Sequence, residues 1–498
     1  MFTVDMQFPF YVYPNSSNKL DGTEFFIGLE KGEKFLYICG TGEGPSRNFE
    51  GEVVGKSFRS RDFEVKKCPL NHHNALNIQK LFPFTRPVLI GRESSFGFGD
   101  RLGLANPGHI RSLVGFNFKP VLAQQSIREL TRTRRTPDNV LDAAVWAVFQ
   151  EGYRDGFGAD ADHLKTTEDI DLMVDAGYTM FTIDPSDHVV MGVNGMKSAD
   201  LFKKVRDLSW KELGDSYSNM VARYEGKTLM VSNSYSIEPS SREIAEACLK
   251  YVEAVVHIKM MHDHLKAKKN ESEIEISIDE SDTVTTPFEH FFIVNELRRM
   301  NVEFVSLAPR FIGGFEKGVD YKGDIRVFKN EYLKHLAISD HFGSYKISFH
   351  SGSDKFSVYK AVASIGRGTI HIKTAGASYL EALKVIAIVE PNLFKEILTF
   401  SVRVYEEEKK SYKVSADPDR VKDVDELNDN ELEGLFLSDD VRQILHVAYG
   451  RVLTERDGNS HFIFRDRIFK CLNQNENLHY ALLANRFKQH MMPFAKMR

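Results

Sequence analysis

The sequence has few cysteines and no long apolar stretch. Its four cysteines are scattered and form no Cys-x-x-Cys pair, which excludes a zinc knuckle or a disulfide scaffold and fits a reducing compartment. No run approaches the roughly 18 apolar residues that a membrane-spanning helix needs. The first residues, MFTVDMQFPFYVYPNS, lack the basic and apolar regions of a secretion signal. We therefore expect a soluble, cytoplasmic protein without a membrane partner.

Positive charge is also limited. Lys and Arg total 65 against 70 Asp and Glu, so the formal net charge is −5 and no nucleic-acid partner is expected. A Gly-x-Gly-x-x-Gly turn after a strand, a Walker loop and a Gly-x-Ser-x-Gly elbow are all absent, which argues against nucleotide-binding and serine-hydrolase functions. What is present is a 498-residue chain with 42% hydrophobic residues, among them 37 Phe. Such a chain buries a large core.

The order of strand-like and helix-like segments predicts the fold. Residues 1–85 form a β-rich segment of short apolar runs separated by turn residues. From 86 to 391, short β-type runs alternate with helical patterns, which is typical of a parallel sheet surrounded by helices. Counting 227–235 as an insertion leaves eight strand–helix units, so we predict an α/β fold with a (β/α)8 TIM-like barrel. Residues 392–498 show no strand alternation and are predicted to form a helical C-terminal region. The predicted strands are 87–91, 120–126, 157–163, 178–184, 273–279, 303–310, 345–351 and 369–376.

Alternation within these strands indicates which side chains face the barrel interior. In EIEISID (273–279) the isoleucines take one parity, so Glu275, Ser277 and Asp279 should point inward. A solvated face would explain this alternation in an edge strand, but a helix-flanked barrel strand has no such face. The same alternation in three other strands predicts that His163 lies at a strand exit. It also predicts inward-facing side chains for Asp160, Asp162, Ser348, His350, His371 and Lys373.

Three histidines and several carboxylates are therefore expected at the C-terminal ends of the strands, where barrel active sites lie. Imidazole nitrogens and carboxylate oxygens are ordinary ligands of Zn²⁺, Mn²⁺, Ni²⁺ or Fe²⁺. We predict a divalent-metal site made by His163, His350 and His371 with Asp279 or Glu275. The pattern leaves open which carboxylate binds metal and which moves protons. Each histidine taken singly also fits a hydrogen-bonded core residue.

Basic and hydroxyl side chains near the same strand ends suggest an anionic substrate. Arg310 ends the strand VSLAPR, and arginine matches a carboxylate with a two-point fork. Ser351 follows His350 at the start of a predicted helix. Lys373 has three interpretations: a Schiff-base lysine, an ion pair with Glu275 or Asp279, or a contact to a substrate carboxylate.

Seven segments, in chain order from 96 to 383, resemble the tagaturonate epimerase (fructuronate epimerase) family of bacterial hexuronate breakdown. Together they cover the whole predicted barrel, and they are long enough that a chance match is not expected. The segments are FGFGDRLGLANPGHI (96–110), QQSIRELTRTRRTP (124–137), FGADADHLKT (157–166), EISIDESD (275–282), EFVSLAPRFIGGFEKGVDYKGD (303–324), FHSGSDKFSVY (349–359) and HIKTAGASYLEAL (371–383).

The resemblance implies a divalent-metal isomerase that interconverts D-tagaturonate and D-fructuronate. On this chain it implies Asp162 as a proton acceptor, His163 and His350 as metal ligands, and a carboxylate of the 273–280 strand as a proton donor. It also implies Glu129 as a further substrate-site residue. The C-terminal helices are expected either to close over the barrel mouth or to form a subunit contact in a homo-oligomer.

The chemistry of this epimerisation restricts its mechanism. The two ketohexuronates differ at a carbon β to the ketone, whose C–H bond the carbonyl does not acidify, so simple enolisation does not invert it. A metal-assisted retro-aldol cleavage followed by readdition does. Two other functions remain compatible with the sequence: an aldolase or lyase that releases the fragments of a keto sugar acid, and a non-catalytic sugar-acid binding protein.

Overall fold

The computed structural model describes residues 10–56 and 63–495, and it contains a closed barrel of eight parallel strands. The barrel is ordered β10-β13-β14-β15-β16-β7-β8-β9. This confirms the predicted TIM-like barrel with a β-rich N-terminal segment and C-terminal helices. The barrel strands are β7 (Ser95–Phe98), β8 (Lys119–Ser126), β9 (Gly158–Leu164), β10 (Met180–Ile183), β13 (Glu273–Ile278), β14 (Ser306–Pro309), β15 (Lys346–Phe349) and β16 (Ile370–Thr374).

The first barrel strand is not the predicted one. Residues 87–90 form an irregular segment outside the barrel, and Val88 and Leu89 are 41% and 48% exposed. Ser95–Phe98 closes the barrel instead, pairing with β16 and β8, and all four of its residues are buried. Gly97 makes that closure possible, because a Cβ there would lie 1.6 Å from Oε1 of Gln124 inside the barrel. A glycine in a four-residue strand gives little β signal in the sequence.

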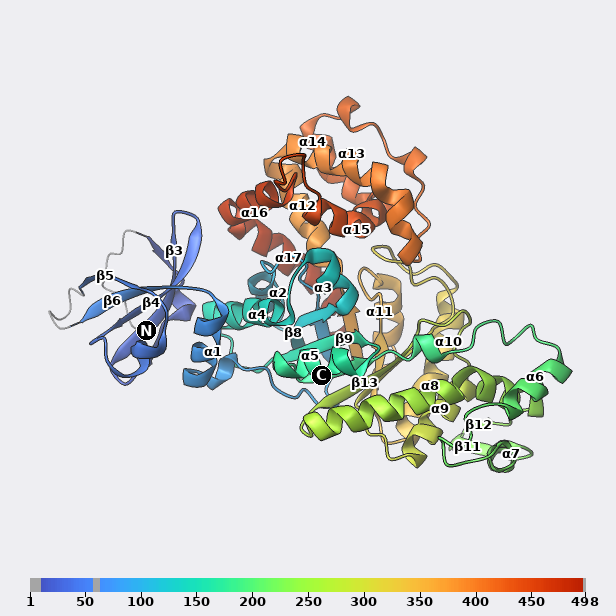
Figure 1. Cartoon of the computed structure of the whole chain (residues 1–498). Helices are drawn as coiled ribbons and strands as arrows, with labels where there is room; N and C mark the ends of the chain where they lie inside the picture. Colours follow the sequence, from blue (N-terminus) through green and yellow to red (C-terminus); the bar gives the residue numbers. More distant parts are fainter. Residues whose placement is uncertain (1–9, 57–62, 496–498) are drawn as a thin grey trace.

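Helices surround the barrel, as Figure 1 shows, and threonine caps fix where several of them begin. Thr136 accepts the backbone N–H of Asn139, and Pro137 takes the first helical position, where no N–H is needed. Thr286 and Pro287 repeat this arrangement. The helices that follow the strands are α2 (Asn106–Ser112), α3 (Ile127–Thr133), α4 (Pro137–Glu151), α5 (Thr167–Asp175), α8 (Ser241–Lys268), α9 (Pro287–Arg299), α10 (Ile325–His341), α11 (Phe356–Ala363) and α12 (Ala377–Val389).

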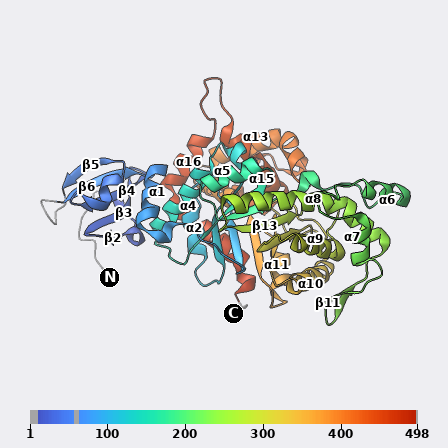
Figure 2. The same cartoon turned by 60° about the horizontal axis from the view of Figure 1, so that its bottom comes forward.

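Two additions extend from the barrel in different directions (Figures 1 and 2). An antiparallel N-terminal sheet is joined through α1 (His72–Leu81), and an insertion separates β10 from β13. The sheet consists of β1 (Tyr11–Val12), β2 (Asn18–Leu20), β3 (Thr23–Glu30), β4 (Glu33–Gly40), β5 (Glu52–Lys56) and β6 (Glu64–Pro69). The insertion contains α6 (Ser198–Arg206), α7 (Tyr217–Tyr224), β11 (Leu229–Ser232) and β12 (Tyr235–Ile237).

The C-terminal helices pack against the barrel's own helices. In Figure 1 they form the upper lobe. A second apolar core joins α12 to them, with Leu380, Phe394 and Leu445 fully buried. The last helix lies against α2 and α12, so the C-terminal region is continuous with the barrel. Its helices are α13 (Pro391–Glu408), α14 (Asp429–Leu432), α15 (Asp439–Thr454), α16 (Arg465–Gln474) and α17 (Glu476–Met491).

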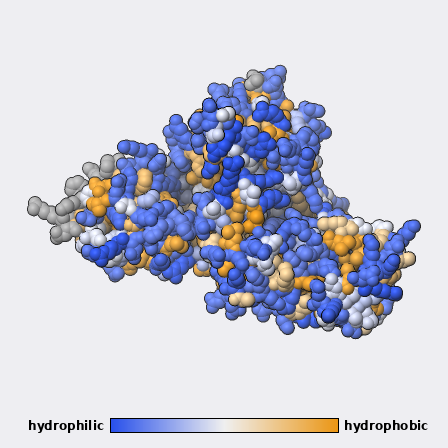
Figure 3. Space-filling view, in the orientation of Figure 1, coloured by the Kyte–Doolittle hydropathy of each residue, from blue (hydrophilic) through white to orange (hydrophobic). Residues whose placement is uncertain are grey.

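The outer surface is mainly hydrophilic on the face seen in Figure 3, with small, separate apolar patches. Within the described parts of the chain, no helix combines the length and apolar character needed to cross a bilayer.

Candidate active site at the barrel mouth

A cavity of about 800 Å³ opens at the C-terminal ends of the strands. Strand ends form its floor, the 311–317 loop forms one side, and residues 410–413 of the C-terminal region reach over it. A second cavity of similar size lies between the N-terminal sheet, α4 and α17. We place the candidate site in the first cavity, because that is where the imidazoles and carboxylates predicted from the strands converge.

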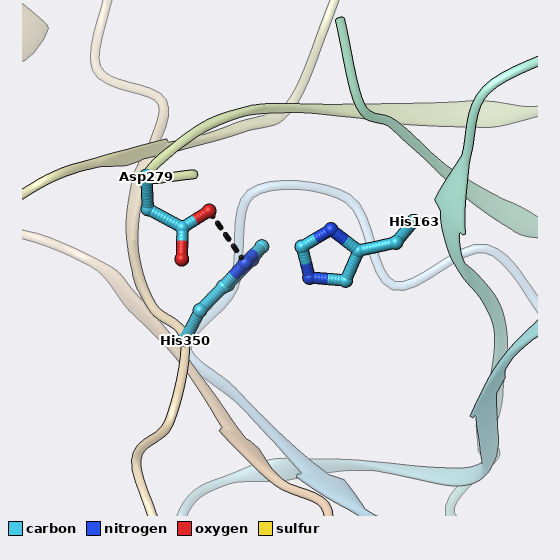
Figure 4. Close-up of side chains that lie close together, drawn as sticks. All are labelled: His163, Asp279 and His350. Atoms are coloured by element: carbon cyan, nitrogen blue, oxygen red, sulfur yellow. Dashed lines mark ion pairs between the residues drawn. The ribbon is translucent and has the colours of Figure 1, made fainter. Parts of the chain in front are cut away.

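His163, His350 and Asp279 form a compact group in this cavity. One nitrogen or oxygen from each lies within 4.8 Å of the others, and Figure 4 shows the His163 ring directed at the other two side chains. Nδ1 of His350 lies 3.1 Å from a carboxylate oxygen of Asp279, which in turn accepts a 2.7 Å hydrogen bond from Ser277. His163 has a φ of 53°, a left-handed conformation that is uncommon for a non-glycine residue and concentrates at functional sites.

Carboxylates outnumber cations around the two imidazoles. Burial alone would lower the pKa of His163, but Asp162 and Asp184 raise it to about 9. Burial would also lower the pKa of His350, but Asp279 and Glu275 raise it to about 10. Without a metal, this site therefore takes up protons to balance its negative charge. A divalent cation would balance the same charge, and two imidazoles with a carboxylate match the ligand preference of Zn²⁺, Mn²⁺, Ni²⁺ or Fe²⁺.

A network of one ammonium group and three carboxylates lies directly beneath this group. The ammonium of Lys373 is 2.7 Å from Asp160, 2.6 Å from Asp162 and 2.8 Å from Glu275. Burial opposes the charge of Lys373, but the three carboxylates raise its pKa well above the usual value. Lys373 and its neighbours lower the pKa of Asp162 and Glu275, while burial raises that of Asp160 to about 6. The ammonium is thus committed to three internal partners.

The structure separates the predicted site residues by depth. Asp162, Asp279, His163, His350, Glu129, Arg310 and Ser351 line the cavity. Glu275, Lys373 and His371 lie in the barrel interior below it. His371, predicted as a metal ligand, is outside the His163–His350–Asp279 group: its Nδ1 is 2.9 Å from Ser95 Oγ, and burial lowers its pKa to about 3. Asp279 supplies the third donor atom of that group.

The predicted substrate contacts differ in how free their polar atoms are. Glu129 is only 4% exposed and accepts a 3.0 Å hydrogen bond from Nε of Arg101, so its charge is already balanced. Nη1 of Arg310 is buried without a partner. Ser351 adopts a φ of 55° at the cavity wall.

Sequence reasoning missed several residues that the cavity brings in. Asp184, directly after β10, holds Nδ1 of His163 at 3.1 Å, and its position at a strand exit was a usable signal. Glu280 is grouped with His163 and Asp184 by the same kind of geometry. Tyr412 and Lys413 lie more than thirty residues beyond β16, in a region without strand periodicity, and no local pattern connects them to the barrel.

Comparison with known proteins gives one consistent family. The family described as tagaturonate epimerase matches residues 13–493. A tagaturonate/fructuronate epimerase of Thermotoga maritima is 42% identical over 485 residues, which covers 96% of each chain. The native crystal structure of the fructuronate-tagaturonate epimerase UxaE from Cohnella laeviribosi superposes with a TM-score of 0.92 at 36% identity, covering 98% of this chain and 96% of that one. A glycerol complex of the same enzyme gives 0.91 at 37% identity, with coverage of 97% and 96%.

Proposed function

This chain belongs to the tagaturonate epimerase family, and from that premise we propose that it interconverts D-tagaturonate and D-fructuronate with the help of a divalent cation. The relatives compared above are named epimerases, so the chain is an isomerase. The observation that carries the proposal is the convergence of His163, His350 and Asp279 with Asp162 at one barrel mouth.

His163, His350 and Asp279 would hold the cation. The fit rests on their donor atoms, which lie close together, and on the excess of carboxylates around them. When bound, a divalent cation supplies positive charge that stabilises the enediolate formed in a retro-aldol cleavage. Glu275 also orients the His350 ring, because it accepts a 2.7 Å hydrogen bond from Nε2 while Nδ1 faces Asp279.

Asp162 is the proposed proton acceptor of the first step. Lys373 and the nearby imidazoles keep it ionised at neutral pH, as a base must be. Asp162 takes the proton of the hydroxyl at the inverted carbon; the bond between that carbon and its neighbour next to the ketone then breaks, giving an aldehyde and an enediolate. Lys373 remains paired with Asp160 and Glu275 when Asp162 is protonated, so its charge never becomes unbalanced.

Readdition to the other face of the aldehyde completes the epimerisation. The alkoxide then formed must recover a proton, and the one that Asp162 took up in the first step restores the balance. A carboxyl group of the β13 end stays the donor that the family resemblance implies, although neighbouring cations lower the pKa of both Asp279 and Glu275. Asp279 lines the cavity, whereas Glu275 lies below it, fully buried. Glu129 and Ser351 stay predicted as substrate contacts at the cavity wall.

A chelation assay in D₂O tests this function. We expect interconversion of the two ketohexuronates to be lost after metal removal and restored by one or more of Zn²⁺, Mn²⁺, Ni²⁺ or Fe²⁺ added singly. We also expect the inverted carbon to retain its hydrogen, followed by NMR, because the retro-aldol route never breaks that C–H bond. Full activity in the chelated protein would contradict the proposed metal dependence. Stoichiometric deuterium at that carbon would contradict the retro-aldol mechanism.

A further inference from the structure

The active-site cavity carries a group of cations that form no direct ion pair with its carboxylates. Within residues 10–56 and 63–495, none of these side chains has a carboxylate oxygen within 4.0 Å, whereas Arg101 in the same cavity is paired with Glu129. The unpaired cations are Arg128, Arg310, Lys317, Lys410 and Lys413.

Three of them have further signs of facing a common point. Nη1 of Arg310 is buried yet unpartnered. Burial and then the charge of Arg310 lower the pKa of Lys413, although the more distant carboxylates of Asp279, Glu280 and Asp282 oppose that shift. The guanidinium of Arg128 lies 5.2 Å from the ring centre of Tyr412, the residue next to Lys413. These cations come from the ends of β14 and β8 and from the loop after α13. Like charges held near one another without a direct ion pair repel, and an anionic ligand bound between them relieves that cost.

Resting on the proposed function, we propose that Arg310 and Lys413, with Arg128 beside them, bind the substrate carboxylate and thereby retain the cleaved aldehyde fragment. The cleavage divides the six-carbon substrate into two three-carbon pieces. One is the enediolate, which receives the electron pair of the broken bond. The other is an aldehyde that still bears the carboxylate, and it holds no other permanent charge by which the protein could keep it.

This carboxylate anchor explains how epimerisation can outcompete fragment release. Inversion requires the aldehyde to present its other face, which it does by rotating about the single bond to its neighbouring carbon. That rotation leaves the carboxylate in place, so a two-point contact to Arg310 need not be broken. Without the anchor, the fragment diffuses away before readdition, and the enzyme becomes an aldolase.

Lys413 also gives the C-terminal region a chemical role. It follows α13 and a short turn at Lys409–Ser411, and it belongs to the only part of that region, among the described residues, that lines the cavity. The C-terminal helices therefore carry one arm of the carboxylate anchor over the barrel mouth.

The test compares Lys413→Gln with Lys413→Arg and with Lys409→Gln. Lys409 lies four residues away and pairs with Glu406 at 2.7 Å without lining the cavity, so it is a matched control for charge loss. For Lys413→Gln we expect KM for the ketohexuronate to rise about tenfold or more, the size of one lost charge-assisted contact. Free aldehyde acid, trapped with a hydrazine reagent during turnover, should appear in this variant only. Lys413→Arg should restore both properties substantially.

A neutral substrate gives a second measurement. In the corresponding ketohexoses, a hydroxymethyl group replaces the carboxylate. Their kcat/KM should hardly change between wild type and Lys413→Gln, so the ratio of kcat/KM for the acid to that for the neutral sugar should fall about tenfold. An unchanged ratio, unchanged KM and no trapped aldehyde would overturn the anchor while the wild-type epimerase stands. A wild-type protein inactive on both ketohexuronates would instead refute the proposed function.

Discussion

At the scale of single residues, Lys373 is the clearest case of chemistry decided by surroundings. The sequence allowed it to form a Schiff base with a keto sugar, which requires a neutral amine. In the structure its ammonium is 3% exposed at the side chain and contacts three carboxylates. Those contacts raise the pKa of Lys373 and leave no free electron pair for attack. Its role is therefore to balance charge beneath the active-site cavity.

Borohydride reduction tests that role. We expect reduction of the protein with either ketohexuronate to leave Lys373 unlabelled, because the charged amine does not form an imine. Peptide mass spectrometry measures the label, and a Lys373→Arg variant, which cannot form an imine, gives the background. A substrate-dependent mass increase on Lys373 above that background would contradict the assignment.

At the scale of elements, the loop after β15 is held by the C-terminal helices. Asp354 is buried in this loop, with a φ of 65°, and pairs with Arg442 of α15 and Arg486 of α17. Its backbone N–H also donates to His490 at 3.0 Å. Burial opposes the charge, but Arg442 and its neighbours keep the pKa of Asp354 well below the usual range. The same loop carries His350 and Ser351, so the C-terminal helices support the active site from outside the barrel.

Replacing Asp354 by Asn should therefore affect both stability and catalysis. The change leaves the buried guanidinium of Arg442 without its anion and removes the nearer of the two carboxylate partners of Arg486, so we expect a loss of about 3–5 kcal/mol in the free energy of unfolding. A fall in kcat should accompany it, because the loop positions His350. Urea unfolding and steady-state kinetics measure the two effects.

Asp340→Asn is the matched control for this variant. Asp340 pairs with Arg367, and both side chains are exposed by 40% or more. Such a surface pair contributes at most about 1 kcal/mol. An Asp354→Asn protein as stable and active as Asp340→Asn would show that the buried network does not hold the loop.

At the scale of the whole molecule, buried histidines are distributed through the barrel and the C-terminal lobe. Burial lowers the pKa of each below its ordinary value, so they are neutral in the native protein. They are His109, His257, His290, His335, His371, His446 and His479. Unfolding exposes all seven to water, where their pKa returns to about 6.5.

This distribution predicts acid sensitivity. Below pH 6.5 the unfolded chain binds more protons than the native one, so the free energy of unfolding should fall between pH 6.5 and 4.5, by an amount on the order of several kcal/mol. Asp142 and Asp160, whose pKa burial raises to about 6, act in the opposite direction. The raised pKa values of His163 and His350 contribute stability that is fully present below pH 6.5 and is lost as pH rises through about 9 and 10.

Urea unfolding of metal-free protein at pH 7 and pH 5 measures this effect. We expect a lower midpoint at pH 5, and a smaller difference between the two pH values in His335→Gln, which removes one buried imidazole whose pKa is about 3 in the native state. Equal midpoints in the wild type at the two pH values would contradict the prediction.

The sequence by itself determined seven of the eight barrel strands and, for the four strands at 157–163, 273–279, 345–351 and 369–376, which side faces inward. Side chains alternate along a strand because of local backbone geometry, so Ile276 had to oppose Glu275 wherever the strand was placed. The same local rule separates Lys373 from Ile372. Thr136 and Pro137 likewise determine a helix start within a few residues.

Only the tertiary structure decided how deep each inward residue lies and which distant segments reach the site. His371 is in register with Ser348, two residues before His350, and therefore lies about 6–7 Å deeper in the barrel. That depth depends on how neighbouring strands are staggered, which is a property of the closed sheet. Lys413 reaches the cavity because α13 and α15 pack beside α12, and such packing between segments far apart in the chain leaves no periodic trace in the residues it brings together.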